Sequence, residues 1–155
     1  DKGIGKAFEK SRMRGVESKD GMDVALCVID PKAMTLKFAG AFRPLWKVHH
    51  GSIHEIRGNR FPIGGGDAYD KSSFTTHELK LEKGDFFYIF SDGYPDQFGG
   101  EKGKKFMNKR FRQLLIDINS KAVEEQVDQL DAKLSEWRGE LEQVDDVLVI
   151  GFGIH

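Results

Sequence analysis

The chain has 155 residues, of which 39% are hydrophobic and 32% are charged, and its formal net charge at pH 7 is -1. This length supports one soluble domain, residues 1–155, that is large enough to bury a core. The near-neutral charge argues against nucleic acid or an anionic membrane as the main partner, and no stretch reaches the roughly 18 apolar residues of a membrane span. We therefore expect neither nucleic-acid binding nor membrane insertion.

Cys27 is the only cysteine and lies in the apolar run at residues 24–29, so we expect a small core residue without a disulfide partner. No signal peptide is visible, and this cysteine usage fits a reducing compartment. We therefore expect a cytoplasmic protein.

The first third of the chain predicts a helix and a hairpin. Residues 5–14 mix charged and apolar side chains before Gly15, a pattern typical of a short surface helix. Strand-like runs follow at residues 22–29 and 34–39, and the second run alternates apolar and polar side chains. The short polar connection between the two runs predicts a hairpin.

A second hairpin is predicted from the runs at residues 45–48 and 53–56, which flank a His-Gly pair at 50–51. Residues 57–73 have few periodic apolar side chains and predict a long loop. Residues 74–81 then resume as a strand.

Five consecutive apolar or aromatic residues at 86–90 predict a strand buried on both faces. The strand ends in Ser-Asp-Gly at residues 91–93, where Gly93 favours a tight turn. Asp92 and Asp96 are then displayed at a sheet edge. An ordinary acidic turn explains this stretch equally well on its own.

The last third predicts two helices and a returning strand. Apolar residues recur at helical spacing over residues 106–118 and again over 123–137. Ser120 is the expected N-cap of the second helix and Gly139 its end. A mostly apolar strand follows at 147–154. This element order indicates a mostly antiparallel α+β fold whose helices cover one face of the sheet.

Acidic residues stand at the ends of the two most apolar strands. Asp92 follows the strand at 86–90 and Asp145 precedes the strand at 147–154, so antiparallel pairing would bring both carboxylates to one sheet edge. A divalent cation would keep such clustered carboxylates charged, and oxygen ligands without cysteine or clustered histidine favour Mg²⁺ or Mn²⁺. The candidate carboxylates are Asp92, Asp96, Asp145 and Asp146.

Other loop motifs give weaker signals. An EF-hand is excluded because the sixth and twelfth positions counted from Asp92 are Gln97 and Gly103, where Gly and Glu are required. A phosphate loop is excluded because no Gly-Lys-Ser or Gly-Lys-Thr follows the glycines at residues 64–66. The acidic residues between 66 and 70 are not expected to bind a metal.

An ordered set of short motifs runs along the chain. The motifs are Asp20-Gly21-Met22-Asp23, Ala39-Gly40-Ala41 with Pro44-Leu45-Trp46, Pro62-Ile63-Gly64, Lys83-Gly84-Asp85, Ser91-Asp92-Gly93 and Gln143-Val144-Asp145-Asp146-Val147. In this order they resemble the SpoIIE/RsbU-like branch of the PPM-type metal-dependent serine/threonine phosphatases. The resemblance covers nearly the whole chain, and the order of the motifs is more specific than any one of them.

The resemblance implies an α-β-β-α sandwich with a dinuclear Mn²⁺ or Mg²⁺ centre between its sheets. It makes Asp92 and Asp145 metal ligands, and it gives Asp96, Asp146 and Gly93 supporting or structural roles beside them. It also implies hydrolysis of phosphoserine or phosphothreonine on a regulatory protein, such as an anti-sigma-factor antagonist. The domain would then be the output end of a bacterial signalling protein that carries an upstream sensor domain.

Two features depart from the family pattern. The opening motifs, Gly-Asp with two hydrophobic residues and Asp, then Asp-x-x-Gly-His-Gly, are absent, and they supply the acids that bridge the two metals. We therefore expect an N-terminally truncated piece, roughly the C-terminal two-thirds of the domain, that is inactive by itself. Phe42 and Arg43 stand where relatives often carry small polar residues, and Arg43 is interpreted as an exposed arginine, with a phosphate contact as the alternative.

Two other functions stay open at this point. A non-catalytic module could keep the fold and use its surface to hold a partner, and the upstream acids would discriminate it from the enzyme. A DNA-binding domain resting on the basic cluster at residues 102–112 would show strongly salt-dependent affinity, which we do not expect. A sheet edge uncovered by truncation also predicts a homodimer or aggregation.

Overall fold

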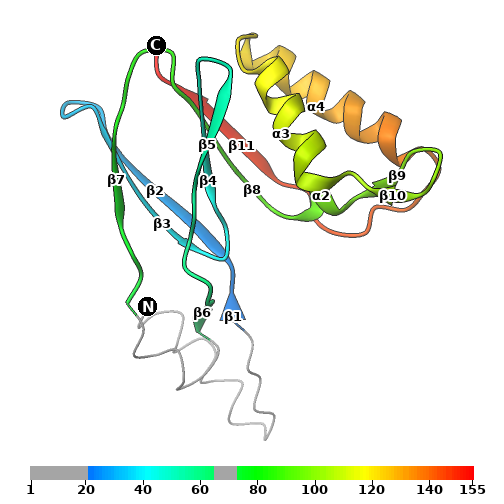
Figure 1. Cartoon of the computed structure of the whole chain (residues 1–155), viewed down its shortest axis with the longest axis horizontal. Coiled ribbons are helices and arrows are strands. Elements are labelled where there is room, and N and C mark those ends of the chain that lie inside the picture. Colours follow the sequence, from blue (N-terminus) through cyan, green and yellow to red (C-terminus); the bar gives the residue numbers. More distant parts are fainter. Residues whose placement is uncertain (1–20, 65–72) are drawn as a thin grey trace, which may run out of the picture. The chain divides into compact units, whose positions relative to one another are not determined.

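The computed structural model of this protein describes residues 21–64 and 73–155 (Figure 1). Two sequence predictions lie outside these residues, namely the surface helix at 5–14 and the acidic segment at 66–70. In the described part of the chain, no helix is long and apolar enough to cross a membrane.

The chain divides into two compact units, the first formed by residues 1–45 and 56–81 and the second by residues 46–55 and 82–155. The first unit carries a three-stranded sheet, and the second carries a four-stranded sheet with two long helices. The strands pair antiparallel in both sheets, which confirms the predicted α+β class. That residues 1–155 form a single domain stays a prediction.

The first hairpin forms as predicted. β2 (Val24–Asp30) pairs with β3 (Thr35–Ala41), and β3 pairs in turn with β7 (His77–Lys80). The Asp30 side chain closes the hairpin turn, because its Oδ1 accepts hydrogen bonds from the backbone N–H groups two and three residues on, both at 2.9 Å. β7 is shorter than the strand predicted at 74–81, since only its four residues pair with β3.

Two smaller differences from the sequence predictions occur in the same unit. β1 (Gly21–Met22) pairs with β6 (Ile63–Gly64), so the loop predicted at residues 57–73 contains one short strand. Arg43 forms an ion pair with Asp23 at 2.8 Å, and its side chain is only 23% exposed. The interpretation of Arg43 as an exposed arginine is therefore wrong.

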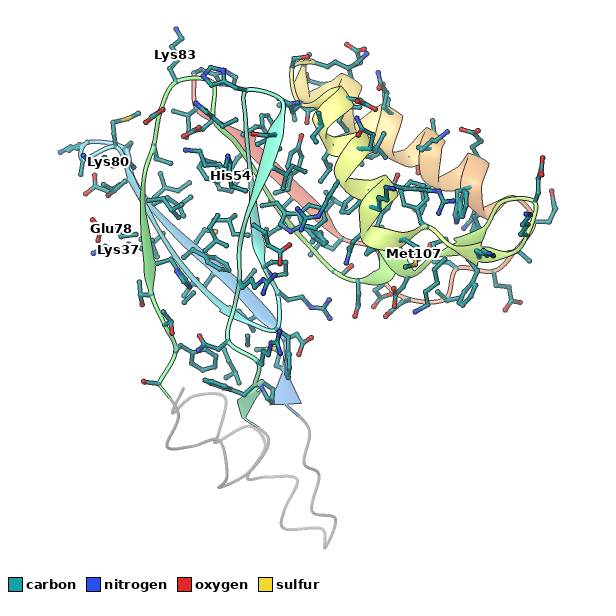
Figure 2. All side chains as sticks on the ribbon, viewed as in Figure 1. Lys37, His54, Glu78, Lys80, Lys83 and Met107 are labelled. Carbon is teal, nitrogen blue, oxygen red and sulfur yellow. The ribbon has the colours of Figure 1, made fainter. Side chains whose placement is uncertain are left out.

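The two faces of the three-stranded sheet differ in character. Leu36 and Phe38 on β3 are fully buried on one face. On the opposite face Lys37 lies across from Glu78 of β7, with 3.7 Å between the charged groups (Figure 2). Leu26, on the edge strand β2, is 57% exposed. An open apolar edge favours self-association, which stays a prediction.

The second hairpin also forms as predicted. β4 (Leu45–His49) and β5 (Ser52–Ile56) are joined by residues 50–51, whose φ angles are both positive, at 47° and 72°, as a type I′ turn requires. β8 (Phe86–Phe90) lies between β4 and β11 (Val149–Gly153), and the sheet order is β11-β8-β4-β5. β8 is almost entirely buried, in agreement with the prediction of a strand covered on both faces.

Two helices, α3 (Met107–Ile118) and α4 (Val123–Arg138), lie side by side in the second unit (Figure 1). They cover one face of its sheet, as predicted, and enclose an aromatic core. The Arg112 guanidinium lies 4.1 Å over the Trp46 ring and pairs with Glu55, and its burial lowers the pKa of Arg112. The buried core residues are Trp46, Val48, Phe86, Tyr88, Phe90, Tyr94, Phe106, Phe111, Leu115 and Ile118.

The start of α4 differs from the sequence prediction. Ser120 is not its N-cap, because the chain turns first at Lys121, whose N–H donates to the Ile118 carbonyl oxygen at 3.0 Å, and α4 begins later without a side-chain cap. Val123 and Val127, the first two members of the predicted apolar face, are 47% and 59% exposed. The predicted end of the helix at Gly139 is confirmed.

Gln126 takes the inward position at the start of α4, and it is only 3% exposed. Its Nε2 donates to the carbonyl oxygens of Asn119 and Lys121, and its Oε1 accepts a hydrogen bond from the Tyr88 hydroxyl at 2.7 Å. A buried amide thus ties the helix connection to the sheet. The spacing of apolar residues contains no signal for such a contact.

A buried ionic cluster stands at the turn that leads into β8. The Asp85 side chain is fully buried, and its oxygens lie 2.7 Å from Lys47 Nζ and 2.7 Å from His49 Nδ1. Asp85 Oδ2 also accepts a hydrogen bond from the Glu82 N–H at 2.8 Å. Because a buried carboxylate needs such compensation, these contacts join β4 to the start of β8.

Replacing Asp85 by Ala should lower the free energy of unfolding by about 3 kcal/mol, because Lys47 and His49 would lose their buried partner. Urea unfolding followed by tryptophan fluorescence measures this loss. Glu78→Ala removes an exposed acid from an ion pair and should cost no more than about 0.5 kcal/mol. Equal losses in the two variants would contradict a special role for the buried cluster.

Two buried tyrosines should make the fold sensitive to alkaline pH. The hydroxyls of Tyr88 and Tyr94 donate to Gln126 and to the Leu130 carbonyl, and burial raises the pKa of both phenols well above the ordinary value of 10.0. The folded state keeps these protons where the unfolded chain releases them, so stability is retained below about pH 10 and falls as the pH rises beyond it. Urea unfolding at a series of pH values should show this fall in the free energy of unfolding. The fall should be shallower in the Tyr88→Phe variant.

Candidate metal centre

The two acidic motifs meet at one edge of the four-stranded sheet. β8 and β11 pair antiparallel from Phe90 opposite Val149 onwards, so the chain leaves β8 beside the segment that enters β11. Ser91 joins the two segments, because its Oγ donates to the Asp146 carbonyl at 2.7 Å and accepts from the Leu148 N–H at 2.9 Å. The predicted antiparallel pairing of these strands is confirmed.

Gly93 lies against the backbone of the second motif. It begins α2 (Gly93–Asp96), a single helical turn that replaces the tight turn predicted here. A Cβ atom at position 93 would lie 2.4 Å from the Asp146 carbonyl oxygen and 2.8 Å from its carbonyl carbon. The glycine is therefore required for space, not for the unusual backbone conformation suggested by the sequence.

Asp92 and Asp145 approach this edge from opposite segments. Asp92 directly precedes α2 and is half-buried, and its carbonyl oxygen accepts the Asp96 N–H at 2.9 Å. Asp145 is exposed, and its Oδ1 accepts a hydrogen bond from the Asp146 N–H at 2.7 Å. The Asp145 carbonyl oxygen also accepts a hydrogen bond from Gln143 Nε2 at 2.9 Å, so each acid takes part in local hydrogen bonds.

The other two candidate carboxylates have different surroundings. Asp96 forms an ion pair with Lys105 at 2.8 Å, which links α2 to β10 (Lys104–Lys105). Asp146 is exposed, and its carbonyl oxygen contacts Ser91 and faces Gly93. The supporting or structural roles of Asp96 and Asp146 stay predictions.

The donor chemistry of this edge suits a hard divalent cation, because carboxylate oxygens are the ligands that Mg²⁺ and Mn²⁺ prefer. Within residues 21–64 and 73–155, however, no group of three or more His, Cys, Asp or Glu side chains is placed to hold a metal ion. These described residues therefore contain no complete metal site. No reaction step can be derived from a metal held by these residues alone.

Gln97 is a further residue that supports this sheet edge, and its role was not predicted from the sequence. It is fully buried; its Nε2 donates to the Glu142 carbonyl oxygen at 2.9 Å, and its own carbonyl oxygen accepts from Trp137 Nε1 at 3.0 Å. These bonds hold the segment that leads to Asp145 against α2 and α4. The only sequence signal for a buried Gln97 is its position among aromatic residues. An exposed polar residue in a loop would give the same signal.

A family model described as Stage II sporulation protein E (SpoIIE) matches residues 8–155 of the chain. The chain belongs to the SpoIIE family. No protein with a curated description matches it.

Solved structures show the same relationship. The SiaA-PP2C domain of Pseudomonas aeruginosa is 31% identical, with a TM-score of 0.80 over 94% of this chain and 56% of that one. The Mn-presoaked SpoIIE phosphatase domain of Bacillus subtilis is 16% identical, with a TM-score of 0.63 over 85% of this chain and 56% of that one. The RsbU and RsbW domains of Rv1364c from Mycobacterium tuberculosis are 17% identical, with a TM-score of 0.63 over 96% of this chain and 41% of that one.

These similarities confirm the PP2C-like fold that the SpoIIE family resemblance implied. The present chain spans 56% of the length of the first two of these relatives. The residues matched by the SpoIIE family model include both acidic motifs of the sheet edge. The metal-ligand roles of Asp92 and Asp145 stay predictions.

The close contact at Gly93 predicts an unusual sensitivity to a single methyl group. Gly93→Ala should lower the free energy of unfolding by about 2 kcal/mol or more, because the new Cβ would collide with the Asp146 backbone. Gly103→Ala is a suitable control: its Cβ meets open space, and its φ of 55° should cost only about 1 kcal/mol. Thermal and urea unfolding of the two variants test this order, and an equal loss would contradict it.

Proposed function

We propose that the protein carrying this chain is a metal-dependent phosphatase that removes phosphate from phosphoserine or phosphothreonine on another protein. The observation that carries the proposal is the edge where β8 and β11 bring the Asp92 and Asp145 segments into backbone contact. Membership of the SpoIIE family and the similarity to phosphatase domains support the same activity.

Each residue of the sheet edge would have its own role in this activity. Asp92 and Asp145 would each offer a carboxylate to Mn²⁺ or Mg²⁺, together with acids from outside residues 21–64 and 73–155. Two bound ions would supply an activated water for in-line attack and neutralise the phosphoryl oxygens. Ser91 and Gly93 would keep the two carboxylate-bearing segments at a fixed separation. The SpoIIE structure from Bacillus subtilis, which was presoaked with manganese, favours this choice of ion.

The substrate and context proposed here follow from the SpoIIE family and its relatives. A small phosphorylated regulator, such as an anti-sigma-factor antagonist, fits an enzyme of this class, and the phosphatase would act in the cytoplasm as the output of a sensor. The structure of Rv1364c, which contains RsbU and RsbW domains, shows that one relative joins a similar domain to a further domain.

A non-catalytic partner-binding module of the same fold is the second candidate. The observation that favours it is the incomplete carboxylate cluster among the described residues. The two candidates differ in the acids that the rest of the protein would supply. Intact Gly-Asp and Asp-x-x-Gly-His-Gly motifs upstream would favour the enzyme, and substituted acids would favour the module.

The activity should appear in the full-length protein with Mn²⁺ and a phosphoserine-bearing protein, measured as released phosphate. Asp92→Asn and Asp145→Asn should each lower the rate roughly 100-fold or more, because each would remove a metal ligand. Asp96→Asn is the matched control and should retain most activity, since Asp96 is engaged by Lys105.

Further measurements make the phosphatase test decisive. A chelator should abolish turnover and added Mn²⁺ should restore it, whereas the 155-residue chain alone should stay near background. An unchanged rate in Asp92→Asn, or no turnover by a full-length protein with both upstream motifs intact, would exclude the proposed phosphatase function.

A further inference from the structure

A groove lies on the second unit, and none of the four candidate carboxylates of the sheet edge lines it. It encloses about 780 Å³ and runs between α3 and α4 to the hairpin of β9 (Phe98–Gly99) and β10. Its lining is mostly apolar, with Phe106, Leu114 and Trp137 among its residues. Neither Asp92 nor Asp145 contributes to it, so the proposed phosphatase chemistry does not account for this groove.

Trp137 forms the floor of the groove, and several contacts hold its side chain in place. The Gly100 N–H donates to the Trp137 carbonyl at 2.7 Å, and the indole N–H donates to the Gln97 carbonyl at 3.0 Å. The Arg110 guanidinium lies 4.7 Å over the indole ring, and one of its N–H groups donates to the Phe106 carbonyl at 3.1 Å. The groove therefore offers a fixed aromatic surface with a cation above it.

Positive charge is in excess at the end of the groove formed by the β9–β10 hairpin. On the α4 side Lys133 is neutralised by Glu136 at 2.8 Å. At the hairpin end Lys102 and Lys104 are exposed and Arg110 lines the groove, and among the described residues no ion pair joins any of these cations to a carboxylate. The acids that line the groove are Glu101, Asp117 and Glu136, against four cations, and in the hairpin Lys102 and Lys104 flank only Glu101 among the lining acids, so this end carries a surplus of positive charge.

We propose that this groove binds an acidic amphipathic helix of a protein partner, with apolar side chains on the Trp137 floor and carboxylates near Lys102, Lys104 and Arg110. The α3 residues that line it run from Arg110 to Asp117, about 10 Å along a helix axis, which matches two turns of an incoming helix. Helix-in-groove recognition uses an apolar floor between flanking elements, and here α3 and α4 flank the groove. The excess of positive charge selects an acidic partner.

The test uses the 155-residue chain and a fluorescein-labelled peptide of about 12 residues, with Leu at helical i, i+3, i+7 spacing and Glu at flanking positions. Fluorescence polarisation should show saturable binding. Lys102→Glu with Lys104→Glu should weaken it about fivefold or more, and raised salt should weaken it as well. Phosphate release is not measured, so the result does not depend on the proposed phosphatase activity.

Matched controls separate the groove from general electrostatics. Lys80→Glu with Lys83→Glu makes the same change of net charge at two positions that do not line the groove, and it should leave the affinity unchanged. A peptide with Ser in place of Leu should bind at least about fivefold more weakly, because it lacks the apolar face. Circular dichroism checks that each variant is folded.

Three results would overturn the proposal. The first is the absence of saturable binding at millimolar peptide. The second is an equal loss of affinity in both charge-reversed pairs, which would indicate attraction to overall charge. The third is tight binding of the Leu-free peptide, which would show that the groove recognises anionic groups and not an amphipathic helix.

Discussion

The candidate site depends on the antiparallel pairing of β8 with β11. These strands are far apart in sequence, yet their register places Phe90 opposite Val149 and leaves Ser91 to bridge the two acidic segments with its hydroxyl. Other elements of the second unit support that pairing. α3 and α4 cover the sheet, and the buried Asp85 cluster fixes the turn from which β8 begins.

Much of the fold could be predicted because local pattern and tertiary environment agree. The two hairpins, the buried strand at 86–90 and the helix at 106–118 all follow from the spacing of apolar residues and the position of glycine. The start of α4 could not be predicted in this way. Gln126 is buried there because three polar partners surround it, and only the folded chain brings those partners together.

The candidate site could be predicted only in part. Asp92 follows one apolar strand and Asp145 precedes another, which indicated a shared edge if the strands were antiparallel neighbours, and the strand pairing confirmed this. The sequence suggested that Gly93 was needed for its backbone freedom, whereas the structure shows that it is needed for space. Asp96 carries the same charge as Asp92 and lies one helical turn away, but Lys105 engages it. Composition does not distinguish such a residue from a metal ligand.

The contact between Gly93 and the Asp146 backbone has a consequence for the evolution of this fold. Because the glycine serves the packing of two chain segments, selection for stability would preserve it even in a descendant that no longer performed chemistry. Glycine at this position therefore marks descent within this fold and does not by itself mark retained chemistry.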